Sequence, residues 1–378
     1  MDIVNWQSVL TEHQVHLLRE FAQLPGVRLR VVTSRHQLKT RQAQGWVPPD
    51  LSGLDVTTLP LRPWLVEGLR MLRQNSTAHH LFGGLWADRR LFALLVYARI
   101  AGYRISVMTE PYADVAVGLL REQSKALSEI KPWLRRIAYR MAGMLFGSVV
   151  SPLFAISPKA VAQFTQAGFR HQAICPFGYF VPPSVTAASP VRSGSGKLRL
   201  AFVGGALHRK GLDIACEAVR AATADGVDVC LHVYGPEVHP YMPATSSSIR
   251  NCGVIAFGNV QKVLASYDAL VVPSRFDGWA VVVNEALLQS VPVIASDAVG
   301  AAAMIQKNGV GFVFPSDHSL ALAEVIKKLA NVPEILAAAR NRILTFQRTL
   351  LPSVAARYML DCFEANTKGA PRPICPWY

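Results

Sequence analysis

The sequence has little charge and few of the features that define secreted or membrane-spanning chains. Only 17% of its 378 residues are charged and 51% are hydrophobic, a composition typical of globular proteins. The longest apolar candidate, Met141 to Ile156, is interrupted by Gly147 and Pro152 and falls short of the about 20 residues that cross a bilayer. We interpret it as a buried helix running into a strand. The opening residues, MDIVNW, show no signal-peptide pattern.

Six cysteines occur without CxxC spacing and without a partner histidine pattern. This arrangement argues against a zinc site and against a disulfide framework, and it predicts buried or free thiols in a reducing compartment. Together with the missing signal pattern, it favours a cytoplasmic protein. We expect no metal site.

Positive charge is concentrated in the first half of the chain. Residues 1–190 carry 21 Lys and Arg against 11 Asp and Glu, and the remainder carries 18 against 14. The segment Lys125 to Arg140 combines cations with aromatic and apolar residues, and Arg62 to Arg73 is similar. Such a helix is typical of a protein that lies on an anionic membrane, here the inner face of the plasma membrane. Apolar residues at helical spacing are equally typical of a core, so both interpretations stay open.

Binding to nucleic acid is the competing explanation of the positive charge. No helix-turn-helix, zinc-finger spacing or RNA-binding aromatic strand is recognisable, and the basic residues are spread over apolar helices. We therefore expect no nucleic-acid partner.

The most informative segment reads VVPSRFDGWAVVVNEALLQSVPVIASD. A short apolar strand precedes a Pro-Ser turn and a loop that carries Asp277 and Gly278. A helix is expected from about Val281, with Glu285 about two turns into it, and a second buried strand over Pro292 to Ala295. Strand–loop–helix–strand units make doubly wound α/β domains, which bind ligands at the carboxyl ends of their strands. The pattern indicates a nucleotide-linked substrate.

A second block supports the first. A strand over Leu198 to Val203 leads into Gly204-Gly205, and a helix is expected from about Leu212 to Ala222. Glycines after a strand let the backbone approach a ligand, and a helix start favours an anion. Arg209 and Lys210 lie between them and would supply positive charge for a diphosphate. Such a pair is also common in a solvated turn.

The residues between these blocks continue the alternation. Val229 to Tyr234 and Val254 to Phe257 are expected strands, and a helix is expected around Gln261 to Ser266. Strands and helices that alternate at short intervals predict a parallel sheet with crossover helices.

Together, the blocks resemble the signature of retaining glycosyltransferases of the GT-B fold, in particular family 4. Asp277 stands where that family usually has Glu, with seven residues between it and Glu285. The resemblance implies the α/β fold class, with two Rossmann-like domains facing a cleft. No DxD sequence occurs, which favours a metal-independent GT-B enzyme over the GT-A type.

The resemblance also implies roles for single residues. Asp277 would hold hydroxyls of the donor sugar and Glu285 those of the ribose, and both are expected catalytic residues together with Glu110. The turn at Asn259, Val260 and Gln261 would pass near the nucleotide base. The expected donor-binding residues are Gly204, Gly205, Arg209, Lys210, Asn259, Val260, Gly278 and Glu285.

The acceptor is expected on the N-terminal side. The loop Trp6 to Gln14 stands where many family members have a Gly-Gly turn, which is missing here. Its candidate cleft residues are Ser8, Thr11 and His13. Glu110 stands where the family often has a His that faces the donor sugar, although a Glu before Pro also caps turns.

The domain boundaries follow from composition and from the resemblance. Residues 1–183 are the predicted acceptor-binding Rossmann-like domain, and residues 184–196 are a Pro-, Ser- and Gly-rich linker. Residues 197–345 are the predicted nucleotide-sugar domain, and the helical residues 346–378 are expected to cross back to the first domain. Expected elements of the first domain are strands near Asp2 to Asn5, Arg28 to Thr33, Val56 to Leu59, His80 to Phe82 and Ile105 to Thr109, and a helix near Glu12 to Ala22.

The expected function is that of a retaining hexosyltransferase without a metal or other cofactor. A UDP- or GDP-sugar would be its donor, and a saccharide or lipid-linked molecule its acceptor, in bacterial exopolysaccharide, capsule or lipopolysaccharide synthesis. One alternative is a sugar-nucleotide epimerase of the same fold. Another is a non-catalytic basic protein that binds a membrane surface or nucleic acid.

Overall fold

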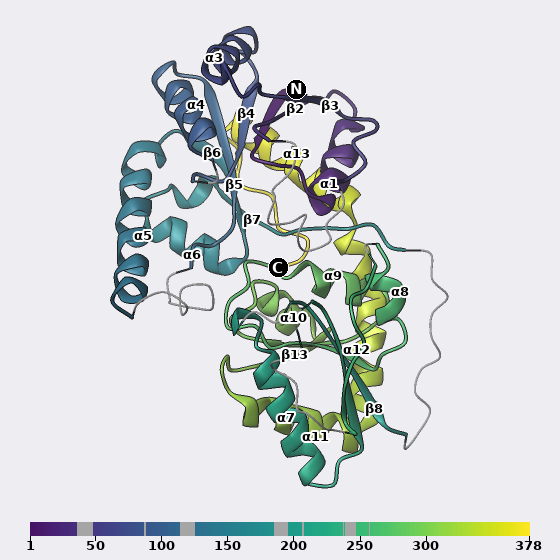
Figure 1. Cartoon of the computed structure of the whole chain (residues 1–378). Coiled ribbons are helices and arrows are strands. Elements are labelled where there is room, and N and C mark those ends of the chain that lie inside the picture. Colours follow the sequence, from purple (N-terminus) through teal and green to yellow (C-terminus); the bar gives the residue numbers. More distant parts are fainter. Residues whose placement is uncertain are drawn as a thin grey trace. The chain divides into compact units, whose positions relative to one another are not determined.

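The computed structural model describes residues 1–35, 48–86, 88–113, 125–184, 196–205, 208–236, 238, 247–256 and 258–378. The chain forms two compact units of α/β architecture (Figure 1). Unit 1 consists of Met1–Asp114, Trp133–Val181 and Leu351–Pro376, and unit 2 of Val115–Pro132, Pro182–Leu350 and Trp377–Tyr378. The predicted linker lies largely outside the described residues.

Unit 1 is built on a seven-stranded sheet in the order β3-β2-β1-β4-β5-β6-β7. All neighbouring strands are parallel, so the carboxyl ends of β1, β4 and β5 share one edge of the sheet. The strands are β1 (Asp2–Gln7), β2 (Arg28–Thr33), β3 (Asp55–Thr58), β4 (His79–Gly83), β5 (Arg104–Thr109), β6 (Val150–Ile156) and β7 (Ile174–Phe177).

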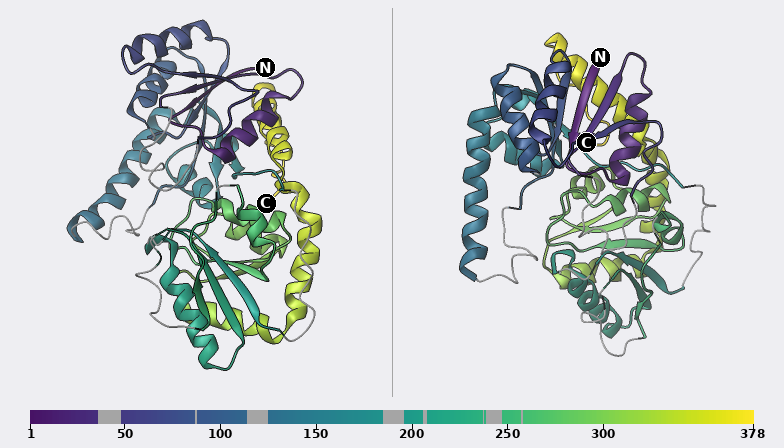
Figure 2. Two further views of the ribbon diagram at one scale, coloured as in Figure 1. Left: turned by 45° about the vertical axis from the view of Figure 1, so that its right-hand side comes forward. Right: turned by 45° about the horizontal axis from the view of Figure 1, so that its top comes forward.

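The helices of unit 1 cover both faces of this sheet, as the views in Figure 2 show. They bury Trp6, Phe82, Leu94 and Phe164 in the main core. Phe21 meets Phe363 with ring centroids 6.3 Å apart, so the last helix packs on the first. The helices are α1 (Glu12–Ala22), α3 (Trp64–Gln74), α4 (Arg89–Ile100), α5 (Lys125–Phe146), α6 (Pro158–Gln166) and α13 (Pro352–Lys368), with a 3-10 turn at His171–Ala173. Of α5, the part from Trp133 on belongs to unit 1.

Unit 2 is built on a six-stranded parallel sheet in the order β10-β9-β8-β11-β12-β13. Its core gathers Leu200, Ile214, Val233 and Phe314. The strands are β8 (Leu198–Val203), β9 (Val229–Tyr234), β10 (Ile249–Asn251), β11 (Ala269–Val272), β12 (Val293–Ser296) and β13 (Gly311–Phe314). The helices are α7 (Leu212–Ala224), α8 (Val260–Leu264), α9 (Val281–Leu288), α10 (Ala302–Asn308), α11 (Ser319–Asn331) and α12 (Pro333–Phe346), with 3-10 turns at His208–Lys210 and Gln347–Leu350.

Most predicted elements are confirmed. The helix Glu12–Ala22 and the strand Arg28–Thr33 have the predicted ends, and the other four strands of the first domain end within two residues of their predicted positions. Among the described residues, no helix is long and apolar enough to cross a bilayer. All six cysteines are free thiols.

Two local predictions are wrong. Residues 254–256 form no strand, and residue 257 lies outside the described part of the chain. The strand of this region is β10, which stops because the Asn251 side chain accepts a hydrogen bond from the Gly253 N–H and turns the chain. The helix before β6 is also not buried as predicted, since Met141, Met144 and Leu145 are exposed while Ala142 and Phe146 face the core.

Candidate active site

The topology of unit 2 directs attention to one position on its sheet. The chain proceeds from β8 outward to β9 and β10, and it then returns to build β11, β12 and β13 on the other side. The strand order therefore reverses between β8 and β11. Open α/β sheets bind ligands outside the carboxyl ends of the strands at such a switch point.

Two loops meet at this point, and a glycine brings them together. Gly211 has a left-handed backbone (φ +69°), and a Cβ there would lie 2.0 Å from the carbonyl oxygen of Pro273. The turn after β8 and the loop after β11 therefore touch at a position that no side chain could occupy. Similarly, a Cβ on Gly235 would lie 1.9 Å from the carbonyl oxygen of Gly204, so the end of β9 also closes on the loop after β8.

The predicted donor residues Arg209 and Lys210 converge on Asp277 in this place. Lys210 Nζ lies 2.6 Å and Arg209 Nη1 3.6 Å from Asp277 Oδ2. Burial alone would raise the pKa of the Asp277 carboxyl, but the charge and hydrogen bond of Lys210, and then the charge of Arg209, hold that pKa below its ordinary value. Asp277 is therefore an anion with two cations beside it.

Arg275 is a residue that the sequence interpretation did not select. Its guanidinium donates to both Asp213 carboxylate oxygens at 2.9 and 2.7 Å, to the His208 carbonyl at 2.8 Å and to Asp317 at 2.8 Å. The backbone N–H of Arg275 also donates, to the Arg209 carbonyl at 2.8 Å. Arg275 thus fixes the loop after β11 to the cationic turn, and the only signal in the sequence was its place in the PSRFDG segment.

Glu285 lies on α9, which follows the Asp277 loop. The helix begins at Val281, so Glu285 is one turn into the helix and not two as predicted. Burial raises the pKa of the Glu285 carboxyl from its ordinary 4.5 to about 7. Burial disfavours the charged form of a carboxyl, and hydrogen bonds donated to the carboxylate favour it. Gly278 lies in the same loop, whose backbone is also bonded to Ala298 and Gly300 through Asp277.

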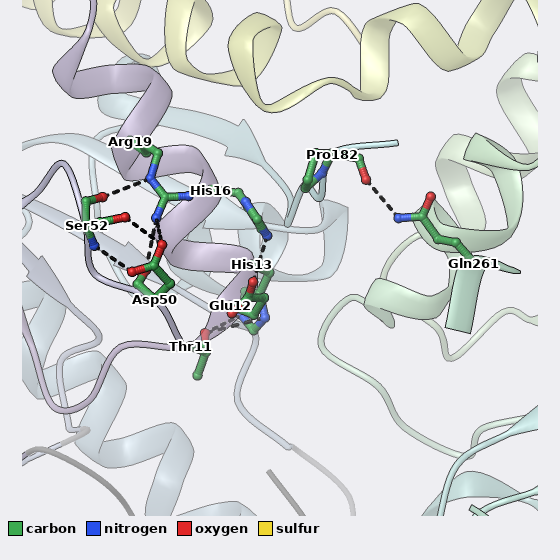
Figure 3. Close-up of polar contacts among 9 residues, drawn as sticks. All are labelled: Thr11, Glu12, His13, His16, Arg19, Asp50, Ser52, Pro182 and Gln261. Carbon is green, nitrogen blue, oxygen red and sulfur yellow. Dashed lines mark hydrogen bonds and ion pairs between the residues drawn. The ribbon is translucent and has the colours of Figure 1, made fainter. Parts of the chain in front are cut away.

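The predicted base-binding turn, Asn259 to Gln261, contains one side chain that is bonded within the protein. The amide of Gln261 donates to the Pro182 carbonyl at 2.8 Å, as Figure 3 shows, and its oxygen accepts from the Ser184 N–H at 2.8 Å and from Gln289 at 3.0 Å. This side chain is therefore occupied in holding residues 182–184. Asn259 and Val260 begin α8, and their contact with a base stays a prediction.

In unit 1, the three predicted acceptor-side residues and the predicted catalytic residue Glu110 line one pocket. It has a volume of about 410 Å³ and lies at the carboxyl ends of β1, β4 and β5. Ser8, Thr11, His13 and Glu110 all contribute to its wall. The neighbouring strand end carries two glycines, Gly83 and Gly84, and both line the same pocket.

The polar groups of the pocket are connected. Tyr179 donates a hydrogen bond to Glu110 Oε1 at 2.7 Å, and its ring centroid lies 4.3 Å from that of His13. The Thr11 hydroxyl lies 3.0 Å from His13 Nε2 (Figure 3) and donates to Gln14 at 2.9 Å. Tyr179 is a second residue that the sequence analysis did not select.

Aromatic rings form another part of the wall. Trp86 is about half exposed and stacks on Phe92, with ring centroids 4.5 Å apart, and Tyr139 stacks on Tyr112 at 4.4 Å. Both Trp86 and Tyr139 line the pocket. A hollow with polar groups and aromatic rings suits a polar molecule that has flat apolar surfaces.

A larger hollow of unit 1, about 730 Å³, contains none of the predicted residues. It lies near the end of α13 and is lined by Arg170, Asn366 and Arg372 among others. The smaller pocket, in contrast, lies at the carboxyl ends of the central strands, where α/β sheets bind ligands.

Comparison with known proteins bears on the site of unit 2. The family model for glycosyl transferases group 1 matches residues 197–331, which contain both the cationic turn and the Asp277–Glu285 segment. Residues 197–331 form a group 1 glycosyltransferase domain. The chain has the two-sheet α/β architecture of GT-B glycosyltransferases.

Individual relatives agree with this. The chain is 32% identical over 150 residues to WcaC of Escherichia coli (strain K12), named as a colanic acid biosynthesis glycosyl transferase. The matched residues are 39% of this chain and 34% of that protein. It is 23% identical over 180 residues to the alpha-D-kanosaminyltransferase of Streptomyces kanamyceticus, covering 46% of this chain and 45% of that protein. The matches thus span less than half the length of these curated relatives.

A solved structure matches nearly the whole chain. Anabaena Alr3699/HepE, in complex with UDP and glucose, superposes with a TM-score of 0.67 at 16% identity and covers 97% of this chain and 100% of that one. Identity this low shows the shared fold alone. The glycosyltransferase domain of this chain therefore rests on the family match, and the architecture of the whole chain on the structural likeness.

Proposed function

We propose that this protein is a retaining glycosyltransferase that moves a sugar from a nucleotide diphosphate-sugar to a saccharide or lipid-linked acceptor. One observation supports it most. Within a group 1 glycosyltransferase domain, Arg209 and Lys210 converge on Asp277 at the point where the strand order reverses. Fixed cations beside a carboxylate suit a ligand that carries a diphosphate next to hydroxyl groups.

Each part of the donor would have its own set of residues. Arg209 and Lys210 would bind the diphosphate together with N–H groups near Gly204 and Gly205. Asp277 would accept hydrogen bonds from hydroxyls of the sugar, with Gly278 leaving room for it. Glu285 would accept those of the ribose, and Asn259 and Val260 would lie near the base. HepE in complex with UDP and glucose supports a uridine donor, although guanosine stays open.

Transfer of the sugar requires that the leaving group, the nucleoside diphosphate, is stabilised. When the bond between sugar and phosphate breaks, negative charge develops on the diphosphate. Cations that are already in position stabilise this charge without reorganisation, and such preorganised groups contribute a large part of enzymatic rate enhancement. Attack on the same face of the sugar would retain the anomeric configuration and would require no protein nucleophile.

The acceptor would bind in the pocket of unit 1. Glu110, oriented by the Tyr179 hydroxyl, and His13, bonded to Thr11, are the groups there that can accept or donate to a hydroxyl. Ser8 contributes a further hydroxyl, and Trp86 an open ring face for a sugar. A role in bacterial polysaccharide synthesis is supported by the name of the Escherichia coli relative.

Thermal shift of the purified chain against UDP-, GDP- and ADP-sugars, with and without EDTA, tests the proposal. We expect one nucleotide class to raise the Tm, with no effect of EDTA and no shift in Lys210→Ala. Lys197→Ala, which removes an exposed lysine of the same unit, should behave as wild type.

Other outcomes would replace the proposal. A folded protein that ignores every nucleotide-sugar would contradict it and favour a non-catalytic role. Conversion of one nucleotide-sugar into another without an acceptor would identify an epimerase. Loss of the shift in EDTA would overturn metal independence.

A further inference from the structure

The helix α5 carries large apolar side chains on its solvent side. Met144 is 77% and Trp133 61% exposed, whereas apolar residues of this size are normally buried. The exposed members of the set are Ile130, Trp133, Leu134, Met141, Met144 and Leu145. Their spacing of three, four and seven residues places them on one side of the helix. This stripe, residues 130–145, is called the α5 face below.

The opposite side of α5 is the side that packs. Ala142 and Phe146 are buried in the core of unit 1. A Cβ on Gly143 would lie 1.6 Å from the carbonyl oxygen of Ala167, so the helix backbone lies directly against the residues after α6. This contact sets the rotation of the helix and turns the α5 face outward.

Positive charge flanks the α5 face on both sides. At 100° per residue, Arg136 and Arg140 lie on one flank and Lys131 on the other. Arg135 lies on the packing side with Ala142 and Phe146, and its guanidinium donates to the Ala113 carbonyl at 3.0 Å. Arg136 and Arg140 are exposed. Residues 130–146 contain no Asp or Glu. An apolar strip with cations at its edges is the pattern of helices that lie in the interface of an anionic bilayer.

The neighbouring candidate, α3, lacks this arrangement. Leu65 and Val66 are exposed there, but Arg70 is paired with Glu67 and Arg73 with the Tyr97 hydroxyl. Its positive charge is therefore partly neutralised, and the inference rests on α5 alone.

We propose that the α5 face docks on an anionic lipid bilayer. Its apolar side chains would enter the interface while Arg136 and Arg140 contact lipid phosphates. Charge complementarity selects this occupant, because a second copy of the chain would place two rows of like charges against each other. Docking requires no nucleotide, so it can hold or fail independently of the proposed transferase activity.

Sedimentation of the full chain with lipid vesicles tests the proposal. We expect the wild type to bind vesicles of phosphatidylcholine with phosphatidylglycerol, to bind far less to phosphatidylcholine alone, and to be released by salt. Arg136→Gln with Arg140→Gln should lower binding to anionic vesicles about tenfold or more. Trp133→Gln with Met144→Gln and Leu145→Gln should abolish it.

Matched controls separate docking from damage to the fold. Leu320→Gln with Leu344→Gln removes two exposed leucines elsewhere and should bind like wild type. All variants should keep the wild-type circular dichroism spectrum and Tm, because the substituted side chains are exposed.

Three results would overturn the proposal. The first is a wild type that binds no anionic vesicles at low salt. The second is vesicle binding of wild-type strength in both α5 variants. The third is a dimer in analytical ultracentrifugation that the α5 variants dissociate, without vesicle binding, which would assign the face to a second copy of the chain.

Discussion

Lys210 Nζ lies 2.6 Å from Asp277 Oδ2, although 67 residues separate the two in the chain. The cation proposed for the diphosphate is thus held by the carboxylate proposed for the donor sugar. When a donor binds, its phosphate would take Lys210 and its sugar hydroxyls would take Asp277, so the ion pair between them would be weakened. The pair therefore keeps two opposite charges in place before the donor binds.

The pairing predicts different effects for its two members. Lys210→Ala should weaken donor binding and lower transfer by at least about 100-fold, because a charge-assisted contact to the phosphates is lost. Asp277→Asn should lower transfer by a similar factor but leave the affinity for the nucleoside diphosphate unchanged or higher, because Lys210 and Arg209 are released for it. Calorimetry with the nucleoside diphosphate and a transfer assay measure the two. Equal losses of nucleotide affinity in both variants would contradict this division.

The pKa of Glu285, raised by burial to about 7, predicts that donor affinity depends on pH. Ribose hydroxyls donate more strongly to a carboxylate than to a carboxylic acid. Affinity for the nucleotide-sugar should therefore rise from pH 6 to pH 8, by at most about tenfold for one titrating group. Glu285→Gln should bind more weakly at pH 8 and show a flat profile. A wild-type profile that survives in Glu285→Gln would assign the titration elsewhere.

The same group predicts the stability of the unliganded protein. Between pH 4.5 and about 7, folded Glu285 retains a proton that the unfolded chain has lost. Stability should therefore fall as pH rises through this window, by up to about 3 kcal/mol from this group. Urea unfolding of wild type and Glu285→Gln at pH 5 and pH 8 measures it. Glu285→Gln should lose less stability over the interval, and parallel losses would contradict the burial.

Two glycines that both have a positive φ provide a matched test of the contact between the turn after β8 and the loop after β11. Gly211 (φ +69°) and Gly226 (φ +83°) are both left-handed, but a Cβ meets the Pro273 carbonyl at 2.0 Å in the first and nothing within 4 Å in the second. Gly226→Ala should cost about 1 kcal/mol from backbone strain. Gly211→Ala should cost several kcal/mol more and reduce donor binding. Similar Tm values for the two variants would show that the loops do not meet as described.

Arg275 should act by positioning. Its side chain is 11% exposed and bonds two carboxylates and a carbonyl, so Arg275→Ala should cost about 2 kcal/mol of unfolding free energy. Donor affinity should fall, whereas the ratio of transfer to donor hydrolysis should stay at the wild-type value. Arg357→Ala removes an exposed ion pair with Asp361 and should change stability by less than about 1 kcal/mol. Unaltered donor affinity in a folded Arg275→Ala would remove this role.

The pocket of unit 1 predicts a loss confined to the acceptor. Glu110→Gln and Tyr179→Phe each remove part of the 2.7 Å hydrogen bond between them. Both should leave the thermal shift with nucleotide-sugar unchanged and lower transfer about tenfold to 1000-fold, within the range of acid–base and orienting groups. A change in nucleotide affinity, or full transfer activity in both, would contradict the acceptor assignment.

Much of the fold could be predicted because its signals are local. The alternation of short apolar runs with Gly, Pro and Asn turns located β8, β11, α9 and β12. The strand wrongly predicted at 254–257 had the same apolar character, but Ile249–Asn251 pairs with the edge of β9 in its place. Apolar runs predict where a strand is favourable, whereas the sheet decides which run finds a partner.

The site could be predicted only as a set of parts. Arg209, Lys210 and Asp277 were each selected, yet their ion pairs depend on two loops meeting across Gly211, which no spacing encodes. Tyr179 and Arg275 act through contacts 62 to 69 residues away and carry no local signal. The α5 face is ambiguous for a similar reason, because core and surface stripes have the same period. The contact of Gly143 decides between them.

The most direct test compares the Kd of a nucleoside diphosphate with that of the monophosphate, for uridine and for guanosine, in wild type and Lys210→Ala. For one base we expect the diphosphate to bind the wild type at least about tenfold more tightly, equivalent to about 1.4 kcal/mol. In Lys210→Ala the two Kd values should become equal. Equal values in the wild type, or a difference that survives in Lys210→Ala, would contradict the diphosphate site.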